Sequence, residues 1–214
     1  MKELLLRGLE KLGVSEYERK AELLYDYVKE LMLFNPALKL VGDKDEKGII
    51  IRHILDSASG YPLFIKYTKA GDTIADLGSG SGLPGIVLAI LLEDRNLVLV
   101  ERMTRRVGFL RGVVAKLKLK NVRIEDKDIR DIKDQYSAIT CRAFHPLYDI
   151  AKESTGLLHD SGYALMYKGQ AKSVKAELDA MSASYSFEAE CIKLDVPYLT
   201  EERNMCVLAG WRRK

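Results

Sequence analysis

The stretch Ile74-Ala75-Asp76-Leu77-Gly78-Ser79-Gly80-Ser81-Gly82-Leu83-Pro84-Gly85 decides the fold, because it passes from an apolar strand through a glycine loop into the start of a helix. The glycines carry no Cβ, so a ligand can approach the backbone N–H groups of the loop closely. Pro84 has the fixed φ that suits a first helical turn. The stretch therefore predicts a strand, a ligand-binding loop and a helix, in that order.

The residues after the loop indicate which ligand it binds. A helical run, Ile86 to Leu92, leads to an apolar strand, Leu97 to Val100, which ends on Glu101. A doubly wound fold holds a ribose with a carboxylate at that place. Asp76 would repel a pyrophosphate and attract an ammonium group. The whole strand-loop-helix-strand unit ending on Glu101 favours S-adenosylmethionine over NAD or FAD. The spacing from Gly80 to Gly85 alone also fits a dinucleotide fingerprint, and a purely structural glycine turn is a further alternative.

The rest of the chain from Thr73 alternates strands and helices, a pattern typical of α/β proteins with a mostly parallel sheet. Further strands are predicted at 122–125, 137–141 and 163–167, helices at 103–119 and 172–181, and an antiparallel closing pair at 187–194 and 205–210. We predict a Rossmann-like fold of the class I S-adenosylmethionine-dependent methyltransferases, preceded by an N-terminal helical extension.

The extension spans residues 1–70, and the methyltransferase domain spans 71–214, with both parts packed as a single unit. Apolar residues at helical spacing predict a first helix that ends at Gly13. Ser15 and Glu18 have the spacing of a capping box before a second helix, which is predicted to stop at Asn35-Pro36. A helical pattern resumes from Ile50 to Ser57 after a polar loop.

Composition predicts a soluble globular protein, since 47% of its 214 residues are hydrophobic and the longest apolar run is far shorter than the ~20 residues that span a membrane. The N-terminus lacks a secretory layout, so we expect a cytoplasmic protein without membrane contact. Three widely spaced cysteines predict neither a disulfide framework nor a metal site.

The distribution of charge is more informative than the net charge of +3. Basic residues gather after the second strand, at Arg102, Arg105, Arg106 and Arg111. Such clusters bind phosphates, and a solvated helix face is the alternative.

Six motifs, spread over most of the chain, carry a resemblance. They are Arg52 to Ser57, Asp76 to Ile86, Arg105 to Leu110, Cys141 to Phe144, Lys168-Gly169, and Pro197 with Glu202-Arg203. Together they resemble the bacterial glucose-inhibited division protein B family, also called RsmG. The Leu83-Pro84-Gly85 ending of the glycine loop is the most specific match. The resemblance implies a methyltransferase that uses S-adenosylmethionine to methylate N7 of a specific guanine in 16S rRNA, with 16S ribosomal RNA or the small ribosomal subunit as partner.

The resemblance also places cofactor contacts at Gly78, Leu83, Ile129, Arg130 and Arg142. The strand-loop-helix unit itself adds Asp76, Gly80, Gly82 and Glu101. The turn after the third strand departs from the family pattern, because it reads Asp128-Ile129-Arg130 in place of Arg-Ala-Glu, and Lys39-Leu40-Val41 replaces Asn-Leu-Thr. Backbone contacts to an adenine survive the first change, whereas side-chain roles at that turn are not carried over.

Methylation at N7 of guanine needs no general base, because this nitrogen has a free in-plane lone pair. Catalysis then rests on alignment of the reacting atoms. Arg142 and Phe144 are the candidate catalytic residues, in the sense of substrate positioning. Arg142 suits a cofactor carboxylate or an RNA phosphate, with a surface salt bridge as the alternative. Phe144 suits stacking on an exposed guanine, with core packing as the alternative.

One cysteine, two histidines and the fold itself allow alternative interpretations. Cys141 fits a packed thiol better than the nucleophile of a carbon-5 methyltransferase. His53 is predicted to make a structural hydrogen bond, whereas His145 is a candidate for activity. The same fold also serves methylation of a protein or a small molecule, and a nucleotide-sensing or RNA-binding module without turnover is a non-enzyme alternative. We expect a monomer.

Overall fold

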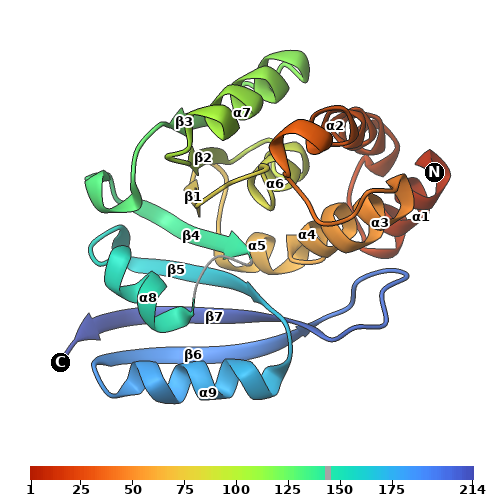
Figure 1. Ribbon diagram of the computed structural model, residues 1–214. Helices are drawn as coiled ribbons and strands as arrows, with labels where there is room; N and C mark the ends of the chain where they lie inside the picture. The colour runs from red at the N-terminus through yellow and green to blue at the C-terminus, as the bar shows by residue number, and fades with distance from the viewer. Residues whose placement is uncertain (143–145) are drawn as a thin grey trace.

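Seven strands form one sheet in the computed structural model, which describes residues 1–142 and 146–214 (Figure 1). Their order is β3-β2-β1-β4-β5-β7-β6. Neighbours from β3 to β5 run parallel, whereas β7 is antiparallel to both β5 and β6. The strands are β1 Thr73–Leu77, β2 Asn96–Val100, β3 Val122–Glu125, β4 Tyr136–Arg142, β5 Leu158–Lys168, β6 Tyr185–Leu194 and β7 Arg203–Arg213. The predicted mostly parallel sheet with an antiparallel closing pair is confirmed.

The chain reverses its direction of travel across the sheet between β1 and β4. After β1 it moves outward to β2 and β3, and it then returns to place β4 on the other side of β1. Ligands of open α/β sheets bind at the carboxyl ends of the strands that flank such a switch point. The end of β1 and the end of β4 are therefore the places to look for a site.

Each face of the sheet carries its own apolar core, because successive strand residues point to opposite sides. In β2, Leu97 and Leu99 belong to one cluster, and Val98 and Val100 belong to the other. The first cluster includes residues of α1 Lys2–Lys11, α2 Tyr17–Leu38, α5 Tyr61–Tyr67, α6 Gly85–Leu91 and α7 Thr104–Lys116. The second includes residues of α8 Leu147–Glu153 and α9 Ala171–Ser182.

The N-terminal helices, coloured red to orange in Figure 1, gather beside α6. Leu5 of α1 and Leu24 of α2 lie in the same core cluster as Ile74 of β1 and Ile86 of α6. A continuous helical stretch, consisting of α3 Glu46–Ile49, a π-helical segment η1 Ile50–Leu55 and α4 Asp56–Ala58, leads from α2 towards the sheet. This stretch carries the Arg52-to-Ser57 motif to the sheet.

Both predicted ends of the second helix are wrong. The N-cap of α2 is Glu16, with a positive φ of 51°, and the Ser15 hydroxyl accepts a hydrogen bond from Lys20 Nζ at 3.4 Å instead of capping the helix. Lys20 is held there because its Nζ also donates to the Leu91 carbonyl. Pro36 does not stop α2, although a proline has no N–H to donate to the preceding turn. The helix continues to Leu38.

Candidate functional site

The glycine loop between β1 and α6 has one packed side and one open side. Gly80 and Gly82 both have positive φ, at 56° and 90°, which favours glycine over other residues. A Cβ on Gly82 would lie 2.6 Å from Ile86 Cγ1 and 3.0 Å from the Tyr27 hydroxyl. At Gly80 the nearest described heavy atom is the Gly78 carbonyl oxygen, at 3.7 Å. Gly82 and the buried Leu83 therefore face the protein interior, and Gly80 is the position open to a ligand.

Asp76, at the end of β1, fixes the start of α6. Its Oδ2 accepts a hydrogen bond from the Gly85 N–H at 3.0 Å, and a Cβ on Gly85 would lie only 2.7 Å from that oxygen. The other oxygen, Oδ1, is buried and has no hydrogen-bond partner among the described residues. Burial raises the pKa of Asp76 to about 7. One carboxylate oxygen thus has unused acceptor capacity at the end of β1.

Glu101, at the end of β2, joins the glycine loop to α7. Its Oε2 accepts from the Gly80 N–H at 2.9 Å, and its Oε1 accepts from the Met103 N–H at 2.8 Å. The side chain is buried, so these bonds hold the loop in place. A carboxylate has about four lone-pair sites, which leaves acceptor capacity for the hydroxyls of a ribose.

A pocket of about 380 Å³ opens beside Glu101, and we call it the carboxyl-edge pocket. Its walls come from the ends of β1 and β2, the start of α7 and the 3₁₀ turn η2 Ile129–Asp131. The lining residues are Gly78, Val100, Glu101, Arg102, Met103, Arg106, Lys127, Asp128, Ile129, Arg130 and Glu153. Four predicted cofactor residues, Gly78, Glu101, Ile129 and Arg130, thus come together.

The turn that departs from the family pattern is ordered by its own side chains. Asp128 Oδ1 accepts from the Arg130 backbone N–H at 3.1 Å and from Arg130 Nε at 2.8 Å, and its Oδ2 accepts from Arg130 Nη2 at 3.0 Å. These hydrogen bonds hold the pKa of Asp128 well below its usual value. The Arg130 guanidinium is therefore engaged with Asp128, while Ile129 is buried at the pocket wall.

Arg142, the last residue of β4, is held by the Arg52-to-Ser57 motif. Its Nη1 donates to Asp56 Oδ2 at 3.0 Å and to the Arg52 carbonyl at 3.2 Å, and its Nη2 lies 2.9 Å from His53 Nδ1. Arg142 Nε is buried and lacks a partner among residues 1–142 and 146–214. Because Asp56 is itself buried, this is an interior ion pair and not the surface salt bridge of the alternative interpretation.

The bonds of Arg142 belong to a larger cluster, the Arg142 network, which consists of Asp43, Arg52, His53, Asp56, Arg142 and Arg203. Asp56 Oδ2 also accepts from Arg203 Nε at 3.3 Å, and His53 Nε2 lies 2.9 Å from Asp43 Oδ2. The predicted structural hydrogen bond of His53 is confirmed. Sequence reasoning missed the roles of Asp43, Asp56 and Arg203, although Asp56 and Arg203 lie inside motifs that carry the family resemblance.

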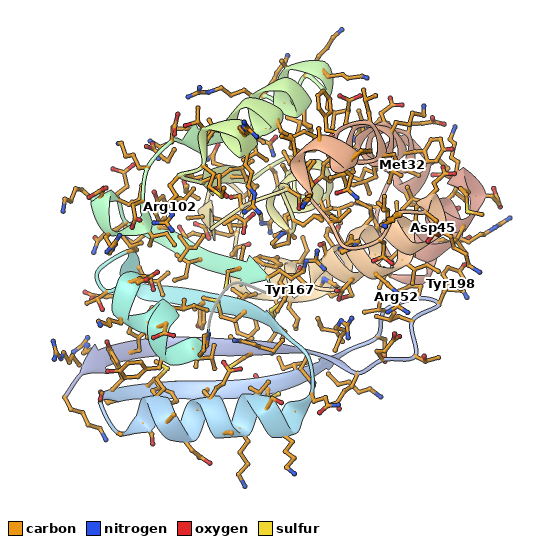
Figure 2. All side chains as sticks on the ribbon, viewed as in Figure 1. Met32, Asp45, Arg52, Arg102, Tyr167 and Tyr198 are labelled. Carbon is orange, nitrogen blue, oxygen red and sulfur yellow. The ribbon has the colours of Figure 1, made fainter. Side chains whose placement is uncertain are left out.

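The pocket lies at the ends of β1 and β2, and the network lies at the end of β4. In Figure 2, Arg102 marks the pocket side and Arg52 the network side, with Tyr167 of β5 between them in this view. The Arg102 side chain is 71% exposed, and Arg106 lines the pocket, so the basic cluster borders it. The predicted site residue Phe144 and the candidate His145 lie outside the described residues.

Cys141 is a packed thiol, as the sequence favours. It is buried, burial raises its pKa to about 12, and its Sγ lies 3.3 Å from Met166 Sδ. Within the described part of the chain, no helix is long and apolar enough to cross a membrane, and no group of three or more His, Cys, Asp or Glu residues could hold a metal ion.

Comparison with known proteins gives consistent matches. The family model described as rRNA small subunit methyltransferase G matches residues 20–206. The ribosomal RNA small subunit methyltransferase G of Treponema denticola is 32% identical, over 96% of this chain and 93% of that protein. The protein of the same name from Borrelia hermsii is 36% identical, over 84% of this chain and 86% of that protein.

Solved structures match the fold at low sequence identity. An S-adenosylmethionine-dependent methyltransferase from Aquifex aeolicus has a TM-score of 0.54 at 16% identity, covering 69% of this chain and 88% of its own. Aeropyrum pernix fibrillarin, whose structure contains natively bound S-adenosylmethionine, has a TM-score of 0.52 at 17% identity, covering 72% and 76%. The predicted Rossmann-like methyltransferase fold is confirmed.

Proposed function

The chain belongs to the rRNA small subunit methyltransferase G family, and from this premise we propose that it methylates N7 of a specific guanine in 16S rRNA of the small ribosomal subunit. S-Adenosylmethionine is the methyl donor, as befits the family and the fold. We propose further that it acts as a monomer in the cytoplasm, with the extension (residues 1–70) and the methyltransferase domain (71–214) packed as one unit.

The observation that carries the proposal is a pair of buried polar atoms, Asp76 Oδ1 and Arg142 Nε, which have no partner among the described residues. Asp76 pairs with Thr140 on β4, and Arg142 lies two residues further along the same strand. The two side chains therefore border the switch point. The amino-acid end of S-adenosylmethionine offers an ammonium to the carboxylate and a carboxylate to the guanidinium.

The carboxyl-edge pocket suits the other end of the cofactor. Glu101 would accept the ribose hydroxyls with its remaining lone pairs, and the backbone of Ile129 and Arg130 would contact the adenine. Gly80 would leave room for the part of the cofactor between its amino-acid end and its adenosine end. Gly82 and Leu83 pack against the protein interior and support the loop from that side. In this binding mode Gly82 and Leu83, which the sequence predicted as cofactor contacts, would act on the cofactor only by supporting the loop.

The chemistry fits a site that orients and excludes water. When bound, the cofactor would supply a methyl group on a positively charged sulfur; transfer to the free lone pair of guanine N7 would break the S–CH3 bond and release S-adenosylhomocysteine. The residues of this chain then have only to align the two reactants. The basic cluster at the start of α7, with Arg102, Arg105 and Arg106, would hold RNA phosphates beside the pocket. Phe144, which follows β4, is proposed to stack on the target guanine.

The test is methyl transfer from labelled S-adenosylmethionine to small ribosomal subunits, naked 16S rRNA or a protein extract. We expect label in RNA, at a guanine that becomes sensitive to borohydride and aniline and that gives no reverse-transcription stop before this treatment. Label in protein, or in an adenine or cytosine, would contradict the proposal. Absence of transfer to every acceptor, with cofactor binding intact, would favour the sensing or RNA-binding module.

A matched pair of variants separates the site from general effects of charge. Arg142→Ala should remove most of the transfer, because it deletes the guanidinium at the switch point. Arg213→Ala removes an exposed arginine at the far end of β7 from Arg203, which belongs to the Arg142 network, and should leave transfer at the parental rate. Equal loss in both variants would argue against a specific role for Arg142.

A further inference from the structure

The Arg142 guanidinium is held in part by a titratable side chain. Its Nη2 lies 2.9 Å from His53 Nδ1, and His53 Nε2 lies 2.9 Å from Asp43 Oδ2. We propose that His53 is a positioning residue of the methyltransferase site, whose neutral imidazole orients Arg142 and thereby makes methyl transfer depend on pH. The inference rests on the role in methyl transfer proposed above for Arg142.

The chemistry of the partners determines the proton positions. Arginine carries hydrogen-bond donors only, so the contact with Nη2 requires an unprotonated Nδ1 on His53. The imidazole proton is then on Nε2, where it donates to the Asp43 carboxylate. Asp43 thus selects the tautomer that accepts from Arg142, in the way that carboxylates orient functional histidines elsewhere.

Protonation of His53 would break this arrangement. An imidazolium carries a proton on both nitrogens, so Nδ1–H would face Nη2–H, and two positive groups would lie in contact. Arg142 would keep its bonds from Nη1 to Asp56 and to the Arg52 carbonyl. It would lose the bond that fixes its second amino group, and the guanidinium could rotate away from the switch point.

The surroundings of His53 favour the neutral form. Burial, and next the positive charge of Arg142, lower its pKa from the ordinary value, although the carboxylates of Asp43 and Asp56 act in the opposite direction. Several elements contribute the charged groups around the ring. They are Asp43 before α3, Arg52 of η1, Asp56 of α4, Arg142 of β4, Arg203 of β7 and, bonded to Arg52, Glu201 in the segment before β7.

Two substitutions separate orientation of Arg142 from simple packing. His53→Asn offers a side-chain oxygen near the position of Nδ1 and cannot titrate, so it keeps an acceptor for Arg142. His53→Leu fills similar space and offers no acceptor. His159→Asn is the matched control, because His159 is exposed at the start of β5, at the opposite edge of the sheet.

The measurement is kcat and KM for methyl transfer to RNA between pH 5 and pH 8, with saturating cofactor for kcat and with unfolding midpoints to verify folding. The parent should lose activity on the acid side of the range. At saturating cofactor, where the titration of Asp76 does not limit cofactor binding, His53→Asn should keep its kcat without that loss. His53→Leu should have an about tenfold lower kcat throughout, the effect of one hydrogen bond to a charged group. His159→Asn should match the parent. Parental activity and pH profile in a folded His53→Leu would overturn the proposal, as would the same acid loss in His53→Asn.

A second readout does not depend on turnover. The chain contains three histidines, and the ¹⁵N signals of His53 can be assigned by their absence in His53→Asn. At pH 7 these signals should show a neutral ring with the proton on Nε2. A proton on Nδ1, or a charged ring at pH 7, would refute the positioning role even if the enzyme were active. If the parent transferred no methyl group to RNA, the proposed function would fail while the spectra still reported the state of His53.

Discussion

Asp76→Asn should change how the stability of this protein depends on pH. The Asn oxygen can still accept the hydrogen bond that Asp76 Oδ2 accepts from the Gly85 N–H, but the side chain can no longer ionise. In the folded parent, burial raises the pKa of Asp76 from its ordinary value of 3.8 to about 7. The substitution therefore removes one group that titrates differently in the folded and unfolded chains.

The sign and size follow from linkage. Between pH 3.8 and pH 7 the folded parent retains a proton on Asp76 that the unfolded chain has released, so its free energy of unfolding falls as the pH rises. Each pH unit in this window costs about 1.4 kcal/mol, and above pH 7 the loss is complete. From pH 5 to pH 8 the variant should therefore gain about 3 kcal/mol relative to the parent.

Urea unfolding of both proteins at pH 5, 6, 7 and 8, followed by circular dichroism, measures this difference. The absolute stability of the variant also reflects a buried amide at Oδ1, so the change with pH is the informative quantity. Asp160→Asn, at an exposed position on β5, is the control and should track the parent at every pH. A difference between Asp76→Asn and the parent that stays constant from pH 5 to pH 8 would refute the reasoning.

Three further outcomes are expected. If the Asp76 carboxylate binds the cofactor ammonium, calorimetry on the parent should show S-adenosylmethionine binding about tenfold weaker at pH 6 than at pH 8. In Asp76→Asn the affinity should change little between these pH values. Equal pH dependence in both proteins would contradict this pairing. Gly80→Ala should lower the free energy of unfolding by about 1 kcal/mol, because Gly80 has a positive φ. Gly82→Ala should lower it by at least about 2 kcal/mol, because the new Cβ also meets Ile86. Equal losses for both variants in urea unfolding would contradict the description of Gly82 as packed. Arg105→Ala and Arg106→Ala should each lower the slope of log affinity for RNA against log salt by about one unit while cofactor affinity stays constant, and unchanged slopes would return the cluster to a solvated helix face.

The glycine loop shows how far local sequence reaches. The apolar run to Asp76, the glycines and the second strand ending on Glu101 predicted β1, the loop, α6 and β2 correctly, because positive φ values and apolar periodicity are properties of neighbouring residues. The same local patterns, with six short motifs, were sufficient for the sheet and the family. They were insufficient at Ser15, whose hydroxyl accepts from Lys20 instead of capping the helix, and at Pro36, which α2 passes before it ends at Leu38.

Only the tertiary structure decided the surroundings of Arg142. Its partners Asp56 and His53 are 86 and 89 positions away in the sequence, and Arg203 is 147 positions from the Asp56 it shares. No local pattern pairs such residues, because their distance depends on the sheet order that places β4 between β1 and β5 and on the helical stretch that brings η1 to its end. The ionisation of Asp76 was equally beyond local reasoning, since its pKa follows from burial, and burial is a property of the assembled core.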